Sequence, residues 1–312
     1  MSDGIQDSGR RLTRKDFLVS VPVALAGVGM FLGRGSKADS GAGAPGAGAI
    51  LGAGAGVAGP GGPGSRATAI GVQLYTLRSV IGEDVEGTLA SLVEMGYQEV
   101  EFAGLYGMTP DEMRAMLDGV GLEAASSHHG LNEVRGDWNA TLEAAATLGQ
   151  DLVVVPSIPG DEHTLEGLLA VAEDFNAAGE AAKAMGLRFG YHNHDWEFEP
   201  LPSGEIPLDL LLENTDPELV SFQLDLFWTV HGGSDPLQYF GAYPGRFTSV
   251  HVKDRTAAGD MVAVGDGVID FGTILARSEQ AGIDHYFVEH DWPDDPMESV
   301  RRSYNALSQV LD

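Results

Sequence analysis

The chain has 312 residues, of which 46 are acidic and 18 basic, so its formal net charge is −28, and it contains no cysteine. A surface this acidic repels phosphate backbones, which excludes nucleic acid as a partner. Without cysteine there is no disulfide, no thiolate ligand and no cysteine nucleophile, so a metal ion would have to be held by His, Asp, Glu or Asn.

Residues 1–34 have the pattern of a targeting segment. Arg10 and Arg11 precede the motif TRKDFL, and a moderately apolar stretch follows over residues 19–33. This stretch is short for a transmembrane helix. The motif resembles the twin-arginine export signal, with Arg14 and Lys15 in the paired position. We therefore predict export to the periplasm or the medium, with an uncleaved N-terminal anchor as the alternative and no other contact with a membrane.

Residues 35–69 are dominated by Gly, Ala and Pro. Such a segment buries too little side chain to offset the entropy lost on ordering, so we expect a disordered linker. The folded domain is then expected over residues 70–312. These residues carry 11 basic and 42 acidic side chains, a net charge of −31.

From Ile70 onward, short apolar runs alternate with amphipathic segments, several of which end in Gly, the residue favoured just past a helix. This alternation predicts parallel β-α-β units. The expected strands are 70–75, 98–103, 122–128, 151–157, 187–193, 221–227, 247–253 and 285–291. Eight units in this length are typical of a (β/α)₈ TIM barrel of ~250 residues. The alternative, a doubly wound open sheet, lacks its usual G-x-G-x-x-G motif here.

Histidine and carboxylate side chains gather at the ends of the last four expected strands. Side chains alternate across a strand, so residues two apart share a face. The pairs that share a face are His192 with His194, Gln223 with Asp225, His251 with Lys253, and Glu289 with Asp291. A barrel brings these strand ends to one mouth. A mixed set of imidazole and carboxylate ligands suits Mn²⁺, Co²⁺, Fe²⁺ or Zn²⁺ better than Ca²⁺ or Mg²⁺.

Residues 70–312 resemble the xylose isomerase-like TIM barrels, a superfamily that includes sugar isomerases and epimerases, inosose dehydratases and apurinic endonucleases. The resemblance is carried by GLRFGYHNHDWEF, FQLDLFWTVHGG, FTSVHVKD, VGDGVIDF and YFVEHD, and more weakly by GVQLYTLR and QEVEFAG. The family usually binds one divalent metal at the ends of strands five to eight. The resemblance implies that His192, Asp225, His251 and Glu289 are the ligands.

Two positions depart from the patterns of this family. Many members have Glu in the fifth strand, as one of two acid/base carboxylates, where this chain has His192. A symmetric two-glutamate mechanism is therefore not expected. The endonucleases have a His three residues after the sixth-strand Asp, where this chain has Trp228. A trinuclear site that cuts DNA is not expected either.

Further candidates lie around the expected ligands. Glu289 and His194 are expected to move protons, and Lys253 to stabilise an enolate oxygen or hold a hydroxyl. The candidate substrate contacts are Glu101, His128, Trp196, Glu197 and Trp228. For Glu101 the alternative is a hydrogen-bonded acid at the bottom of the barrel, for Glu197 a role in ending its loop, and for the aromatic residues simple packing.

The sequence therefore predicts a metal-dependent isomerase or epimerase that removes a proton next to a carbonyl and forms an enediolate. The substrate is expected to be a free sugar, a keto-sugar or an oxidised glycoside. The alternatives are a keto-glycoside lyase or hydratase, a metal-dependent hydrolase, and a carbohydrate-binding barrel without activity. The sugar, the metal and the oligomeric state stay open, and a homo-oligomer is compatible with the sequence.

Overall fold

A computed structural model of the chain describes residues 69–312. The predicted signal at 1–34 and nearly all of the predicted linker at 35–69 lie outside the described residues, so the proposed domain boundary remains a prediction. The strands of the barrel are β1 (Ile70–Gln73), β2 (Glu99–Phe102), β3 (Glu123–His128), β4 (Leu152–Val155), β5 (Arg188–His192), β6 (Val220–Asp225), β7 (Phe247–Val252) and β10 (His285–Val288). They are all parallel and close in the order β1-β10-β7-β6-β5-β4-β3-β2. The predicted TIM barrel is confirmed.

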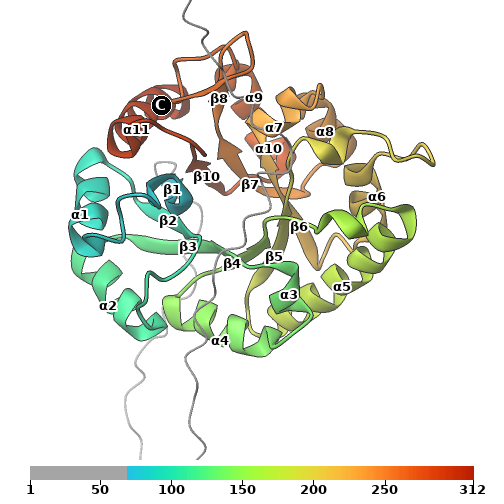
Figure 1. The fold of residues 1–312 in the computed structure, drawn as a ribbon, viewed down its shortest axis with the longest axis horizontal. Helices are drawn as coiled ribbons and strands as arrows, with labels where there is room; N and C mark the ends of the chain where they lie inside the picture. Colours follow the sequence, from blue (N-terminus) through green and yellow to red (C-terminus); the bar gives the residue numbers. More distant parts are fainter. Residues whose placement is uncertain (1–68) are drawn as a thin grey trace, which may run out of the picture. The chain divides into compact units, whose positions relative to one another are not determined.

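Helices surround the barrel on its outside (Figure 1). The longer ones are α1 (Val85–Met95), α2 (Pro110–Val120), α4 (Trp138–Leu148), α5 (Leu165–Ala184), α6 (Pro207–Asn214) and α11 (Pro296–Leu311). The shorter ones are α3 (Leu131–Val134), α7 (Leu226–His231), α8 (Pro236–Ala242), α9 (Phe271–Leu275), α10 (Ser278–Ala281), and the 3₁₀ helices η2 (Leu74–Leu77), η3 (Gly160–Glu162) and η4 (Trp196–Phe198). A small hairpin, β8 (Asp254–Arg255) and β9 (Met261–Val262), follows β7. Among residues 69–312, no helix combines the length and apolar character needed to cross a membrane.

All eight predicted strands are present. The eighth ends three residues before its predicted end, and the first, fourth and sixth end two residues before theirs. The sixth ends at Asp225 because this residue caps α7, its Oδ1 accepting the N–H of Trp228 at 2.9 Å. The eighth ends at Val288, and the N–H of His290 bonds instead to the hydroxyl of Thr76 at 3.0 Å. The strands therefore stop where the candidate site begins.

A charged cluster lies at the N-terminal end of the barrel, opposite the candidate site. The Arg188 guanidinium bonds Asp151 at 2.7 Å and Asp284 at 2.6 Å. Nδ1 of His285 lies 2.8 Å from Glu99, and its Nε2 lies 3.4 Å from Asp151. Burial opposes a charge on His285, but Asp151 and Glu99 outweigh it and raise the pKa of the imidazole to about 9.

This raised pKa predicts a loss of stability at alkaline pH. A group whose pKa is higher in the folded than in the unfolded protein stabilises the fold fully below its unfolded value of ~6.5. That contribution disappears as the pH rises through about 9. We expect the free energy of unfolding to fall by roughly 2–3 kcal/mol more between pH 7 and pH 10 in the wild type than in His285→Gln. Denaturant titration at both pH values measures the difference, and equal losses would contradict this role.

The buried carboxylate of Asp254 organises the chain that follows β7. It accepts backbone N–H groups from Arg255 at 2.8 Å, Gly265 at 3.0 Å, Gly267 at 3.0 Å and Ile269 at 3.2 Å. Gly267 has to be glycine here, because a Cβ would lie 2.2 Å from Oδ1 of Asp254 and 2.3 Å from the carbonyl of Arg255. The side chain of Asp254 thus fixes the loop of residues 255–269, which connects β7 to the segment before β10.

Replacing Asp254 therefore leaves buried N–H groups without an acceptor. We expect Asp254→Ala to lower the free energy of unfolding by about 3 kcal/mol or more, because hydrogen bonds to a charged group are among the strongest. Asp266→Ala in the same loop is the control, since Asp266 makes a surface ion pair with Arg302 that is worth about 1 kcal/mol or less. Urea unfolding measures the loss of stability in both variants. Similar losses in Asp254→Ala and Asp266→Ala would argue against this role of Asp254.

Candidate active site

The register of the barrel brings the predicted ligands together. His192 at the end of β5 is paired with Gln223 of β6, and Asp225 is paired with His251 of β7. Next to β7 lies β10, and Glu289 follows its last residue. Four adjacent strands therefore deliver these side chains to the C-terminal mouth, as expected for a TIM barrel.

Asp225, His251 and Glu289 form a compact buried group whose candidate ligand atoms all lie within 4.8 Å of one another. Nδ1 of His251 lies 2.7 Å from Oε2 of Glu289 and 3.9 Å from Oδ2 of Asp225. Yet Nδ1 of His251 and Oδ2 of Asp225 are buried without a hydrogen bond of good geometry, although Lys253 lies 3.0 Å from Oδ2. Buried polar atoms of this kind need an explanation, and a cation shared by the three residues provides one. This donor set fits a divalent transition metal.

Glu101 sets the orientation of the His251 ring. Oε1 of Glu101 lies 2.5 Å from Nε2 of His251, which places a proton on that nitrogen and directs Nδ1 toward Asp225 and Glu289. Gln73 and Gln223 each donate to the same carboxylate at 2.8 Å. Carboxylates that orient a metal-binding histidine in this way are a usual part of metal sites.

The charge of Glu101 is stabilised in its buried position. Burial opposes this charge, but His128 and His251 outweigh it and hold the pKa of Glu101 well below its usual value. Its carboxylate is completely buried among hydrogen-bond donors, so it is placed to position His251. Glu101 is hydrogen-bonded, as the alternative expected, but it lies beside His251 of the candidate site and not at the bottom of the barrel.

Gln223 orients His192 in the same manner. Its Oε1 lies 3.1 Å from Nδ1 of His192 and 2.8 Å from Nε2 of His128, so both rings donate to one amide oxygen. Nε2 of His192 is then an acceptor, 3.7 Å from Oδ2 of Asp225. Burial, followed by the neighbouring His251, lowers the pKa of His192 well below its usual value and keeps the ring neutral. Sequence reasoning assigned no role to Gln223, although this residue shares a strand face with Asp225.

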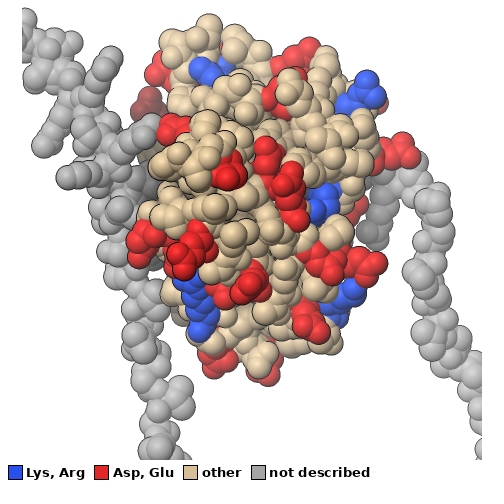
Figure 2. Space-filling model, turned by 90° about the vertical axis from the view of Figure 1, so that its right-hand side faces the viewer, with Lys and Arg blue, Asp and Glu red and all other residues tan. Residues whose placement is uncertain are grey.

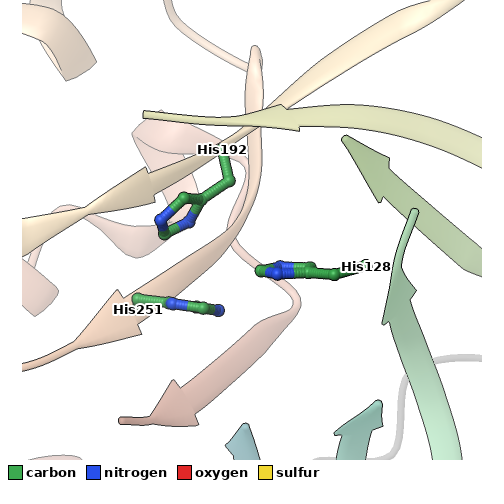
Figure 3. A group of neighbouring side chains, drawn as sticks. All are labelled: His128, His192 and His251. Carbon is green, nitrogen blue, oxygen red and sulfur yellow. The ribbon is translucent and has the colours of Figure 1, made fainter. Parts of the chain in front are cut away.

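His128, His192 and His251 form a second group whose candidate ligand atoms lie within 4.8 Å of one another. Figure 3 shows the three rings gathered at one place, each projecting from a different strand. His192 therefore belongs to this histidine group and lies beside the group formed by Asp225, His251 and Glu289. His128, predicted to contact substrate, lines the same mouth from β3 and stacks on His251 with ring centroids 5.4 Å apart.

Lys253 is buried, with 2% of its surface exposed. Its Nζ lies 2.7 Å from Glu289, 2.8 Å from Asp291 and 3.0 Å from Asp225. Burial opposes the charge, but Asp225, Asp291 and Glu289 outweigh it and hold the pKa of the ammonium well above its usual value. Lys253, predicted from the sequence as a catalytic group near the metal, thus lies among the predicted ligands.

Aromatic side chains line the rim of the mouth. The rings of His194 and Trp228 lie 5.8 Å apart, and those of Trp228 and Trp292 lie 6.4 Å apart. Trp292 is 56% exposed, and the buried Nε1 of Trp228 has no hydrogen-bond partner. Trp196 stacks on His163 at 3.5 Å between centroids. Flat apolar faces and an unused N–H donor suit the C–H faces and hydroxyl groups of a sugar.

Glu197 does not reach this mouth. It is buried, accepts the hydroxyl of Tyr191 at 2.5 Å and accepts the backbone N–H of His194 at 2.8 Å. Burial raises the pKa of Glu197 to about 8. The residue therefore shapes the segment that presents His194, which agrees with the alternative of a role in its loop.

Comparison with known proteins agrees with the fold. An inosose dehydratase from Geobacillus kaustophilus (strain HTA426) is 26% identical over 230 residues, which are 61% of this chain and 74% of that protein. A crystal structure of a sugar phosphate isomerase/epimerase from Parabacteroides distasonis ATCC 8503 is 30% identical, with a TM-score of 0.70, and the match covers 78% of this chain and 94% of that chain. A xylose isomerase-like TIM barrel protein from Mycobacterium smegmatis, solved in complex with magnesium, has a TM-score of 0.61 over 78% of this chain and 96% of that chain. At 13% identity it shows the common fold alone.

The family model described as xylose isomerase-like TIM barrel matches residues 89–310, which is more than half of the chain. The protein therefore belongs to the xylose isomerase-like TIM barrel family.

Proposed function

We propose that this protein is a divalent-metal-dependent enzyme that removes a proton next to the carbonyl of a sugar-like substrate, and that it then eliminates a hydroxyl or glycoside group. The observation that carries the proposal is the convergence of Asp225, His251 and Glu289 at the barrel mouth, where Nδ1 of His251 and Oδ2 of Asp225 lack hydrogen bonds of good geometry. Sites of this type stabilise the negative charge that develops on an oxygen when a neighbouring C–H bond is broken.

Asp225, His251 and Glu289 would hold the metal, and His192 would be the fourth ligand. Glu101 and Gln223 orient the two imidazoles. When bound, a divalent ion polarises a carbonyl oxygen and lowers the cost of the adjacent negative charge by several kcal/mol. Burial opposes a charge on His251, but Glu289 and Glu101 outweigh it and raise the pKa of the imidazole to about 10. The ring would therefore have to release a proton before Nδ1 could serve as a ligand.

Proton transfer is assigned to Glu289 and His194. Lys253 and His251 hold the pKa of Glu289 below its usual value despite burial, so it is ionised, the form that a proton acceptor needs. Burial lowers the pKa of His194 to about 3, so this imidazole is neutral. One carboxylate and one imidazole are unequal partners, which suits an elimination, where one group takes the C–H proton and the other assists the leaving group.

The relatives support an elimination. Several similar proteins are named inosose dehydratases, and a dehydratase removes water. Isomerisation or epimerisation is the second candidate, favoured by the 30% identical sugar phosphate isomerase/epimerase. Both outcomes share the first proton transfer and differ in where the proton or leaving group goes.

The substrate is proposed to be an uncharged sugar or polyol with a carbonyl group. Phosphate is usually bound by Arg or Lys, but three carboxylates already contact Lys253 in the mouth. Figure 2 shows acidic side chains spread over one side of the molecule and few basic ones, a charge that repels phosphates. Export through residues 1–34 is part of the same proposal, because an exported enzyme meets mainly unphosphorylated sugars.

The metal assignment is tested by substitution of its ligands. We expect wild-type protein to hold about one equivalent of a transition metal, and Asp225→Asn or His251→Ala to lose most of it, because each removes a donor from a compact set. Elemental analysis after gel filtration measures this content. His285→Gln is the matched control, since it changes a buried histidine at the other end of the barrel. Undiminished metal in both ligand variants would reject the assignment.

The reaction is tested with inososes and keto-sugars in D₂O. We expect the C–H signal next to the carbonyl to disappear in the NMR spectrum, together with the appearance of an enone absorbance if elimination follows. Glu289→Gln and His194→Ala should each slow this by about 10²-fold or more, a usual contribution of acid–base groups. Hydrolysis without exchange would favour a hydrolase, and binding without exchange for every ketone tested would favour a carbohydrate-binding barrel.

A further inference from the structure

The ammonium of Lys253 contacts two of the proposed metal ligands, Asp225 and Glu289. The ammonium lies 3.0 Å from Oδ2 of Asp225 and 2.7 Å from Oε2 of Glu289. Oδ2 of Asp225 also has no hydrogen-bond partner, so it is the oxygen left for a metal. The lysine side chain and a metal ion therefore have to use the same two carboxylates.

Two cations at these carboxylates repel each other. A transition metal binds carboxylate oxygen at about 2.0–2.2 Å, and an ammonium within 3 Å of the same atoms places like charges very close together in a buried site. Repulsion at such distances remains strong even with effective screening. The ammonium and the metal cannot both keep these contacts at full strength.

Asp291 gives the lysine a separate partner. Nζ of Lys253 donates a hydrogen bond to Oδ1 of Asp291 at 2.8 Å, and Asp291 is outside the compact ligand group. The contact with Asp225, in contrast, lacks hydrogen-bond geometry. The side chain can therefore give up its contacts with Asp225 and Glu289 and stay charged and bonded.

We propose that the ammonium of Lys253 is a tethered cation that holds Asp225 and Glu289 together before a divalent metal binds, and that it yields these two carboxylates to the metal while it keeps Asp291. The inference rests on the proposed metal site. Its consequence is that the protein stays folded without metal and binds metal more weakly than its ligands alone would. The lysine is thus a positioning residue for the ligand carboxylates.

The test compares Lys253→Met with wild type, Lys253→Arg and Lys183→Met. Zn²⁺ affinity is measured by competition with a chromogenic chelator, and thermal unfolding is followed in EDTA and with added Zn²⁺. Lys253→Met should bind Zn²⁺ at least tenfold more tightly than wild type and unfold at a lower temperature in EDTA. Lys253→Arg keeps the charge and should stay within about threefold of wild type. Lys183 is exposed and pairs with Glu218 on the surface, so its variant should behave as wild type.

The outcomes separate this inference from the proposed function. If Lys253→Met is unfolded in EDTA, Zn²⁺ should restore its fold, which supports the inference. Wild-type affinity or weaker binding in Lys253→Met, or unchanged stability in EDTA, would overturn it and leave the metal site of the wild type standing. Absence of Zn²⁺ binding in the wild type and in Lys253→Met alike would reject both.

Discussion

The site depends on the balance of charge around carboxylates that the barrel has removed from water. Asp225 is completely buried, and Glu289 and Asp291 are each 6% exposed. Unpaired charges in such a place are strongly unfavourable. Lys253 compensates all three, and the raised pKa of His251 supplies a second positive charge. The positive charges of Lys253 and His251 therefore lie next to the same carboxylates that would bind a divalent ion. The carboxylates that need these charges for stability are thus the ones that the proposed chemistry uses.

The direction of the donor atoms is set by residues that would not touch a metal. Glu101 reaches across from β2 to fix His251, and Gln223 on β6 fixes His192 and is itself bonded to Glu101. These contacts fix the orientation of both rings, so Nδ1 of His251 and Nε2 of His192 both lie near Asp225. Substituting Glu101 or Gln223 would disturb the ligands without removing one.

The alternation of apolar runs with amphipathic segments was sufficient to predict the barrel. The alternation of side chains along each strand then placed Asp225, His251 and Glu289 at one mouth. These patterns could not predict the hydrogen bonds around Glu101. Those bonds join β2 to β6 and β7, which lie far from β2 in the sequence. Nor could these patterns show that Glu197 turns inward to bond Tyr191, or that Trp196 stacks on His163. The end of the sixth strand was misjudged because LF continues its apolar run, whereas the side chain of Asp225 begins a helix.

The two ends of the barrel show why residue type is a weak guide to function. His285 at the N-terminal end lies between Glu99 and Asp151, and Arg188 completes a cluster in which charges are matched by close partners. At the C-terminal end, His251 lies between Glu101 and Glu289, yet its Nδ1 and Oδ2 of Asp225 lack hydrogen bonds. The same side chains thus stabilise the fold at one end and remain incompletely satisfied at the other. Incomplete satisfaction in a buried cluster, rather than the presence of His and Glu, is what identifies the C-terminal end as the place for a bound ion and substrate.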